Sequence, residues 1–359
     1  MSSSSPAFGL LVAGNTYGGW TSISVRRSIE ELAWSFRCTY TDRWLADADP
    51  TPINTGDSCV VTIDGVGIIS GYVDDSSGSY EGNSHSLEAT GRSKAGDLCD
   101  CSAIFQGGRW KQATLTQIAT DLCQPFGLEV IADTDVGNAI PVFSIEPGET
   151  VYSALDRAAR LRGILVTSDA GGNVRLTRAG QTKSATQIAY GANVKSSSKR
   201  SSWKDRFSFY QLLGQSQGND NWNGTAAAHI SATANDPYVK RYRPLQVNIQ
   251  EQGTAGLQQH VQWEANVRAG RSARYTYRVP GWYCAEGVWQ PNVMVSVEDP
   301  NWGLEEDLLI VTVELSRSAE GTIAELELAP RAAFDLVQFP ARKVRRKAIR
   351  NEAKADNKR

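Results

Sequence analysis

The chain has 359 residues, of which 41% are hydrophobic and 21% charged, and 37 Lys and Arg against 39 Asp and Glu give a formal net charge of -2. This composition is typical of ordinary globular proteins, and the near-neutral balance excludes a general attraction to nucleic acid or acidic membranes. The length exceeds what one hydrophobic core usually organises, so several domains are expected.

The N-terminus and the apolar runs indicate where the protein is made. Residues 1–6 carry no basic side chain, and the apolar stretch Phe8–Ala13 is too short for the core of a signal peptide. No apolar run approaches the ~20 residues that span a bilayer. We therefore expect a protein that is synthesised in a cytoplasm and does not insert stably in a membrane.

The first predicted domain covers residues 1–92 and is rich in β-strands. Apolar and polar side chains alternate in Ser22–Val25 and Trp34–Tyr40, which is the period of a half-buried strand. The turn Asp64-Gly65 and the Ser/Gly-rich segment Asp74–Asn83 are predicted to separate the strands that follow. Those strands are expected over Cys59–Ile63, Gly67–Val73 and Ser84–Ala89. The pattern favours a meander.

Residues 93–190 are predicted to form an α/β insert with two helix-strand units. One helix is expected from Thr114 to about Gln124, because its apolar residues recur at positions i, i+3, i+4 and i+7. A second is expected from about Thr150 to Arg162, ending at Gly163. A hairpin should follow this helix and cover it. Its strands are expected over Ile164–Thr167 and Val174–Thr177.

A second β domain is predicted over residues 191–335, followed by a basic tail over 336–359. The Ser/Lys-rich segment Lys195–Ser202 is expected to be a linker or an exposed loop. A helix is expected from about Gly256 to Gly270. Strands are expected over Phe207–Leu213, Leu245–Gln250, Val293–Val297, Leu308–Leu315 and Thr322–Leu328.

The two predicted β domains share a pattern that indicates an internal repeat. Val61–Asp64, Tyr72–Asp74 and Leu87–Ala89 have counterparts in the same order in the second domain. The counterparts are Val295–Glu298, Thr312–Glu314 and Leu326–Leu328. We infer two similar small β-barrels that flank the insert, with a mainly β, α+β fold overall. Because strand patterns are common, chance similarity is the alternative interpretation.

The polar residues predict neither a metal site nor a cofactor. Cys99 and Cys101 are the only close pair among six cysteines, and the three histidines supply no second cluster at ligand spacing, so buried thiols are favoured over zinc. No hydrolase or phosphate-loop motif is present. The acidic groups Asp74-Asp75 and Glu305–Asp307 are more typical of solvated turns than of acid-base chemistry. We therefore expect no enzymatic activity.

Five of the ten tryptophans lie in turn-like contexts, where they could stack on sugars or bases. Aromatic side chains are also enriched at protein interfaces, so interface or core positions are favoured over ligand stacking. The five residues are Trp20, Trp222, Trp282, Trp289 and Trp302.

The C-terminal tail is strongly basic and is the candidate partner-binding segment. It could be a solvated end, it could neutralise nucleic-acid phosphates, or it could bind an acidic protein partner. The candidate residues are Arg342, Lys343, Arg345, Arg346, Lys347 and Arg350.

Two segments, Gly91–Ser102 and Pro147–Val166 with the hairpin that continues through Leu176, resemble the baseplate hub proteins of Mu-like contractile phage tails. The resemblance implies a ring-forming homotrimer in the virion tail baseplate, made in the host cytoplasm. It implies a structural adaptor between the sixfold tail tube, or a distal tail protein, and the threefold central spike, in contact with other baseplate proteins.

The same resemblance implies a channel through which DNA passes during genome ejection, without sequence-specific binding. Two other hypotheses stay open at this point. One is a Trp-rich carbohydrate-binding or cell-wall-degrading tail module, and the other is a DNA-binding protein that uses the basic tail.

Overall fold

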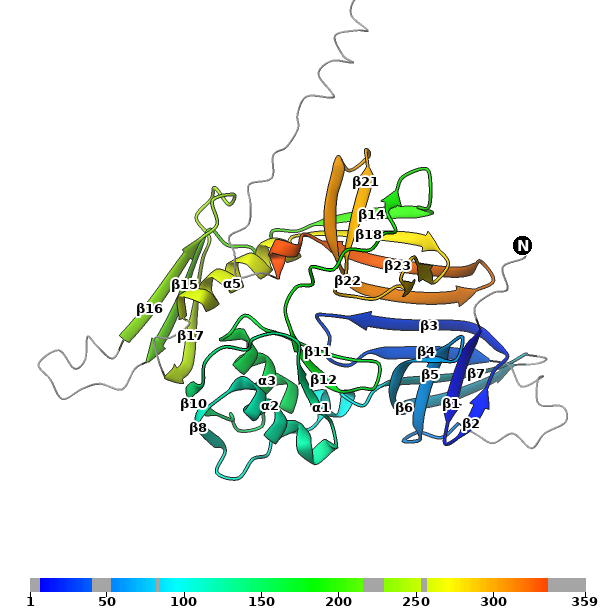
Figure 1. Cartoon of the computed structure of the whole chain (residues 1–359), viewed down its shortest axis with the longest axis horizontal. Helices are drawn as coiled ribbons and strands as arrows, with labels where there is room; N and C mark the ends of the chain where they lie inside the picture. Colours follow the sequence, from blue (N-terminus) through cyan, green and yellow to red (C-terminus); the bar gives the residue numbers. More distant parts are fainter. Residues whose placement is uncertain (1–6, 41–52, 82–83, 216–228, 253–256, 335–359) are drawn as a thin grey trace, which may run out of the picture.

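A computed structural model describes residues 7–40, 53–81, 84–215, 229–252 and 257–334, and about half of these residues lie in β-strands (Figure 1). The largest sheet is continuous, in the order β14-β18-β23-β22-β3-β4-β7-β6-β5-β1-β2, and β21 and β13 extend it beside β22. The helices of the insert lie together on one side of this sheet.

The first β region contains seven strands, and the predicted ones are confirmed. They are β1 (Phe8–Val12), β2 (Asn15–Tyr17), β3 (Trp20–Ser28), β4 (Ser35–Tyr40), β5 (Ser58–Ile63), β6 (Val66–Glu81) and β7 (Ser84–Ser93). Asp74–Asn83 was predicted to separate two strands. This prediction is wrong for the residues up to Glu81, because Asp75–Glu81 continue β6 and their backbone pairs with β7. The side chains there are polar, whereas backbone hydrogen bonds make the ladder.

The insert has the predicted helices and hairpin. Its elements are α1 (Gly96–Asp100), β8 (Arg109–Ala113), α2 (Leu115–Cys123), the 3-10 turn η2 (Gln124–Phe126), β9 (Val130–Ala132), β10 (Ile140–Ser144), α3 (Val151–Arg160), β11 (Leu165–Ser168) and β12 (Val174–Thr177). The Thr114 and Thr150 hydroxyls accept hydrogen bonds from the backbone N–H groups of Gln117 and Ser153, each at 3.2 Å. These N-caps fix where α2 and α3 begin.

The strands of the C-terminal region belong to the large sheet, to a separate sheet of three strands and to the small hairpin β19·β20. Its elements are β13 (Ile188–Ala189), β14 (Ser196–Ser201), β15 (Phe209–Gln215), β16 (His229–Asn235), β17 (Pro244–Gln252), α5 (Leu257–Arg271), β18 (Ala273–Pro280), β19 (Tyr283–Cys284), β20 (Gly287–Val288), β21 (Met294–Asp299), β22 (Leu304–Ser318), β23 (Gly321–Ala329) and the 3-10 turn η3 (Arg331–Ala333). The predicted loop over Lys195–Ser202 is wrong, because β14 pairs with β18 along its whole length.

Strands β15, β16 and β17 form a separate sheet, and α5 packs on it. Tyr210, Leu212, Leu257, Val261 and Ala265 belong to a hydrophobic cluster that this sheet shares with the helix. This unit lies at the left of Figure 1, above the insert. The division of the chain at residues 92, 190 and 335 stays a prediction.

The two β regions repeat one strand order. In the first, β3-β4-β7-β6-β5 are neighbours, and in the second the neighbours are β14-β18-β23-β22-β21, with every pair antiparallel. The predicted pair of barrels needs correction, because the described strands close neither unit on itself. Instead β22 pairs with β3 and merges both units into one sheet.

One hydrophobic core extends through both repeated units. It contains Leu10 and Val61 from the first and Tyr277 and Leu326 from the second. Gly71 lies beside this core, in the part of β6 that pairs with a strand on each side. It is opposite Cys59 of β5 on one side and Ser93 of β7 on the other. A Cβ atom on Gly71 would lie 1.8 Å from the carbonyl oxygen of Arg92. Only glycine fits there without movement of the backbone.

Replacing Gly71 with alanine is therefore expected to destabilise the fold by about 3 kcal/mol, the upper end of the cost of overpacking a well-packed site. Gly67→Ala in the same strand is the matched control, because its Cβ would lie 3.5 Å from Cγ1 of Val60, an ordinary contact. Denaturant unfolding of both variants measures the difference. Equal midpoints would show that β6 can move away from β7 at little cost.

Candidate assembly interface

The register of the strands aligns the two repeated units residue by residue. Both long strands contain an irregularity, after Val73 in β6 and after Ile310 in β22, and 237 positions separate these two residues. The partners across the ladder, Gly91 and Leu328, are also 237 positions apart. The matching irregularities identify β6 with β22 and β7 with β23.

The alignment continues through the next two strands of each unit. Gly91 pairs with Phe36, which pairs with Val25 in β3. In the same order, Leu328 pairs with Tyr275, which pairs with Lys199 in β14. Strand β14 is therefore the counterpart of β3. The residue pairs that the sequence suggested, such as Val61 with Val295, are shifted, because Val61 aligns with Val297.

The joint between the two units is the antiparallel pair β3·β22, in which Val25 lies opposite Leu315 and Ser28 opposite Thr312. The Ser28 hydroxyl lies 3.0 Å from that of Thr312 and donates to the Val311 carbonyl at 3.3 Å. The Ser28 carbonyl accepts from the Trp34 indole N–H at 3.1 Å. These contacts are buried, and satisfied buried polar groups hold the joint in one arrangement.

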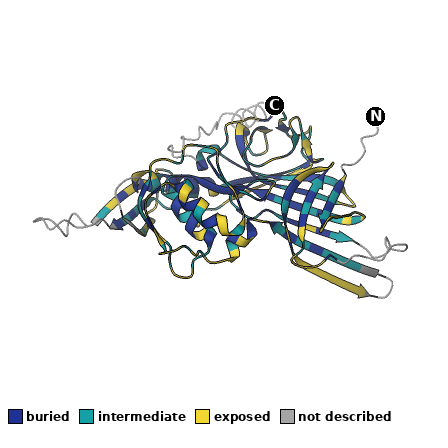
Figure 2. Ribbon diagram, turned by 60° about the horizontal axis from the view of Figure 1, so that its bottom comes forward, coloured by how far each residue is buried: buried dark blue, intermediate teal, exposed yellow. Residues whose placement is uncertain are grey.

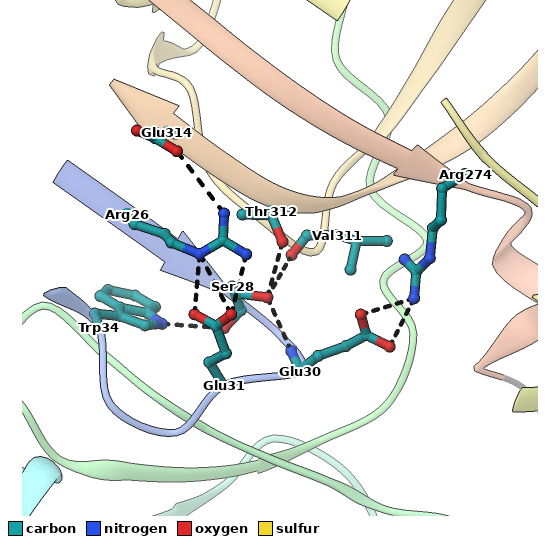
Figure 3. A network of polar contacts seen from close by, with 9 residues as sticks. All are labelled: Arg26, Ser28, Glu30, Glu31, Trp34, Arg274, Val311, Thr312 and Glu314. Carbon is teal, nitrogen blue, oxygen red and sulfur yellow. Dashed lines mark hydrogen bonds and ion pairs between the residues drawn. The ribbon is translucent and has the colours of Figure 1, made fainter. Parts of the chain in front are cut away.

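Two neighbouring glutamates after β3 hold the joint from different sides (Figure 3). Glu30 accepts from Arg274 at the start of β18 at 2.7 Å and from Arg271 at the end of α5 at 2.9 Å. Glu31 pairs with Arg26 at 3.0 Å, and Arg26 also lies 3.8 Å from Glu314 of β22. Glu30 and Arg274 are mostly buried, whereas Glu31 and Arg26 are more open to solvent.

A buried arginine fixes the same strand from the core side. Arg27 is 3% exposed, and its guanidinium donates to the Trp289 carbonyl and lies 5.7 Å from the centre of the Trp34 ring. Burial lowers the pKa of Arg27 to about 10, because desolvation disfavours its charged form. The side chain therefore links β3 to the loop that follows β20.

Around the β3·β22 joint, the face of the sheet that points away from the shared core is polar, whereas the same face is apolar where α5 packs on Leu309 and Val311. Ser24 donates to Glu314 at 2.8 Å, and Arg37 lies 3.5 Å from Glu88. A small hollow of about 110 Å³ on this face is lined by polar side chains only. The lining residues are Arg26, Thr276, Thr312, Glu314, Glu325 and Glu327. This face extends across the joint from one unit to the other.

The described residues contain no group of three or more His, Cys, Asp or Glu side chains that could hold a metal ion. All six cysteines are free thiols. Of the acidic residues in the predicted turns, Asp74 is paired with Arg92 at 2.6 Å and Asp307 with Lys183 at 2.8 Å, at separate places in the fold. Within the same ranges, no helix combines the length and apolar content needed to cross a membrane.

A cleft of about 350 Å³ lies between β14 and α5 and is rich in arginine. Arg160, Arg268 and Arg271 are engaged in ion pairs with Asp156, Glu264 and Glu30. The first two pairs lie within α3 and α5, and the third joins α5 to the segment after β3.

The turn tryptophans lie mostly in or against the core. Trp282 and Trp289 are 0% and 2% exposed, and Trp20 and Trp302 pack against the same cluster. These core positions agree with the expectation of interface or core positions over ligand stacking, whereas Trp222 lies outside the described residues. So do all the candidate residues of the basic tail, whose role stays a prediction. No sequence signal pointed to β14 and the distal part of β6 as strand edges.

Three family models match the chain in succession. The N-terminal model of the Mu phage baseplate assembly protein GpP-like family matches residues 7–93, and the second domain of the baseplate hub protein gp44-like family matches residues 95–178. The fourth domain of the Mu phage baseplate assembly protein GpP matches residues 253–337. Together these models cover the first repeated unit, the insert, and the second repeated unit from β18 onward.

Relatives that match nearly the whole chain agree with these models. The baseplate hub protein gp44 of Escherichia phage Mu is 32% identical over 332 residues, which cover 89% of this chain and 87% of that protein. The 43 kDa tail protein of prophage MuSo2 from Shewanella oneidensis is 37% identical, with a TM-score of 0.79 over 91% of this chain and 99% of that one. A tail protein from Neisseria meningitidis, 23% identical, has a TM-score of 0.81 over 94% and 100% of the two chains. The repeated β units, the capped insert and these similarities show that the chain belongs to the baseplate hub proteins of Mu-like phage tails.

Proposed function

We propose that three copies of this hub protein form a closed ring that joins the sixfold tail tube to the threefold central spike. The observation that carries the proposal is the strand order repeated twice within one continuous sheet. Because each chain presents two related units, three chains present six to a sixfold partner while keeping threefold symmetry. A distal tail protein could take the place of the tube, and other baseplate proteins would bind outside the ring.

The polar face of the sheet supports a channel along the ring axis. The apolar side chains of the joint, such as Val25 and Leu315, point into the shared core, so the polar face beside the joint is the one available to line a passage. Its charges are mixed and paired, as in Arg37 with Glu88. A wall of this kind would let DNA pass without sequence-specific binding, because a cation paired with a carboxylate neutralises phosphates less well than an unpaired one. The protein would act mechanically and without catalysis.

A carbohydrate-binding or cell-wall-degrading module is the competing function. It would need aromatic side chains exposed for stacking on sugars. The burial of Trp282 and Trp289 and the packing of Trp20 and Trp302 favour the structural role.

The test is the mass of the purified protein in solution, measured by size-exclusion chromatography with light scattering. A ring of three chains is expected at three times 39.1 kDa. Incubation of the same sample with purified cell walls is expected to leave their turbidity unchanged. A monomer at micromolar concentration, or clearing of the walls, would remove the proposal.

A further inference from the structure

Several strand edges in the large sheet have no neighbouring strand among the described residues, and two of them belong to strands that the repeat matches with each other's partners. One is β14, at the end of the sheet, and the other is the part of β6 from Asp75 to Glu81, on the side away from β7. Ser76–Tyr80 are exposed at every position, and in β14 only Ser197 is partly covered. Figure 2 shows the β6–β7 hairpin projecting from the body, with one of its strands largely yellow. Such edges are templates for another strand.

The repeat shows what each edge would bind. Strand β14 is the counterpart of β3, and β6 is the counterpart of β22, as the matched registers establish. Within the chain, β3 and β22 are paired with each other, and the corresponding residues are covered there: Val25 and Leu315 are 1% and 0% exposed. The joint is thus made once inside the chain, and counterparts of its two halves, β14 and the distal part of β6, have no neighbouring strand among the described residues.

We propose that β14 of one subunit pairs antiparallel with the Asp75–Glu81 part of β6 in the next subunit, copying the β3·β22 joint. This inference rests on the proposed ring and names the contact that closes it. The register follows from the alignment: Leu315 corresponds to Gly78 and Val25 to Lys199, so Lys199 lies opposite Gly78 of the neighbour. Ser198 then lies opposite Ser79, and Ser201 opposite Ser76.

The direction of the backbone N–H groups agrees with this register. Ser202 donates its N–H to the carbonyl of Ser272, just before β18, so by alternation the N–H groups of Arg200 and Ser198 also point toward β18. The N–H of Lys199 therefore points outward, to the open edge. In the internal joint, Ile29 donates to the Val311 carbonyl. By the same alternation the N–H of Val25, the counterpart of Lys199, points toward β22.

The charges also suit the joint. Arg200 occupies the position of Arg26, which lies opposite Glu314 and near it at 3.8 Å. The residue opposite Arg200 would be Ser77, whose neighbour across the β6·β7 ladder is Glu88, the counterpart of Glu325. Arg200 would thus reach the carboxylate of Glu88 in β7 of the neighbouring subunit, across β6. Opposite charges on facing strands favour pairing, so this contact helps to set the register.

The test is a disulfide between subunits in the double variant Ser79→Cys with Ser198→Cys. These residues form a non-hydrogen-bonded pair in the proposed register, with Cα atoms about 4.5 Å apart, a separation that a disulfide accepts. Mild oxidation of the full chain is expected to give covalent trimers on a non-reducing gel. A mixture of the two single variants is expected to give covalent dimers only, which shows that the bond joins different chains.

The matched control is Ser76→Cys with Ser198→Cys, which the same register separates by three residues, about 10 Å along the strand. It is expected to form no more covalent product than the parent chain, whose six native thiols set the background. Equal linkage of both double variants, or none in a sample that light scattering shows to be trimeric, would overturn the strand pairing and leave the ring intact. A monomeric parent would overturn both.

Discussion

Replacing Lys199 with proline is expected to convert the ring into monomers. Proline removes the outward backbone N–H of β14, and its ring would press against the incoming β6 strand. The inward N–H groups of the neighbouring residues, which pair β14 with β18, are kept. Light scattering should therefore show the mass of one chain, 39.1 kDa, for a protein that still unfolds cooperatively.

Lys199→Ala is the control for the loss of the side chain. It keeps the N–H and removes the ammonium that lies 5.5 Å from the centre of the Tyr275 ring, a contact worth about 0.5–1 kcal/mol at exposed sites. This variant is expected to stay trimeric. A trimeric proline variant would mean that β14 is not the edge through which subunits join, and a monomeric alanine variant would assign the effect to the lysine side chain.

Replacing Glu30 with alanine is expected to reduce the free energy of unfolding by about 3 kcal/mol, the range seen when one partner of a buried ion pair is removed. The side chain of Arg274 is 10% exposed and that of Glu30 is 20% exposed. Without Glu30, the guanidinium of Arg274 stays buried beside the joint with its main counter-charge gone. Denaturant unfolding at one fixed protein concentration measures the loss, since assembly adds to apparent stability.

The adjacent residue supplies the matched control. Glu31 is 44% exposed and its partner Arg26 is 38% exposed, so Glu31→Ala is expected to cost less than about 1 kcal/mol. Both variants remove one carboxylate from the same loop after β3, so they change the net charge equally. Similar losses in the two variants would show that burial of Arg274 does not control the strength of the joint.

The insert was the part of the fold that could be predicted best from the sequence. Its helices begin at the predicted threonines, and the two strands of its hairpin lie where they were expected. These features depend on contacts between residues a few positions apart, such as the Thr150 hydroxyl with the N–H of Ser153. Local signals of this kind can be recognised in the sequence alone.

The repeat could be detected from the sequence but not aligned. Alternating strands have a period of two, so Val61 matches Val295 as well as it matches Val297, and only the ladder decides between them. The irregularities after Val73 and Ile310 settle the alignment, and both depend on pairing between distant strands.

The sequence by itself determined the class of the fold, the capped helices of the insert and the likeness to baseplate hub proteins. Only the tertiary structure decided that the two β regions merge through β3·β22, across 284 positions between Ser28 and Thr312. It also decided that Lys195–Ser202 and Asp74–Glu81, whose polar side chains are typical of loops, contribute strands. Backbone groups make a β ladder, so a strand whose partner lies in a distant segment needs no apolar side chains to mark it.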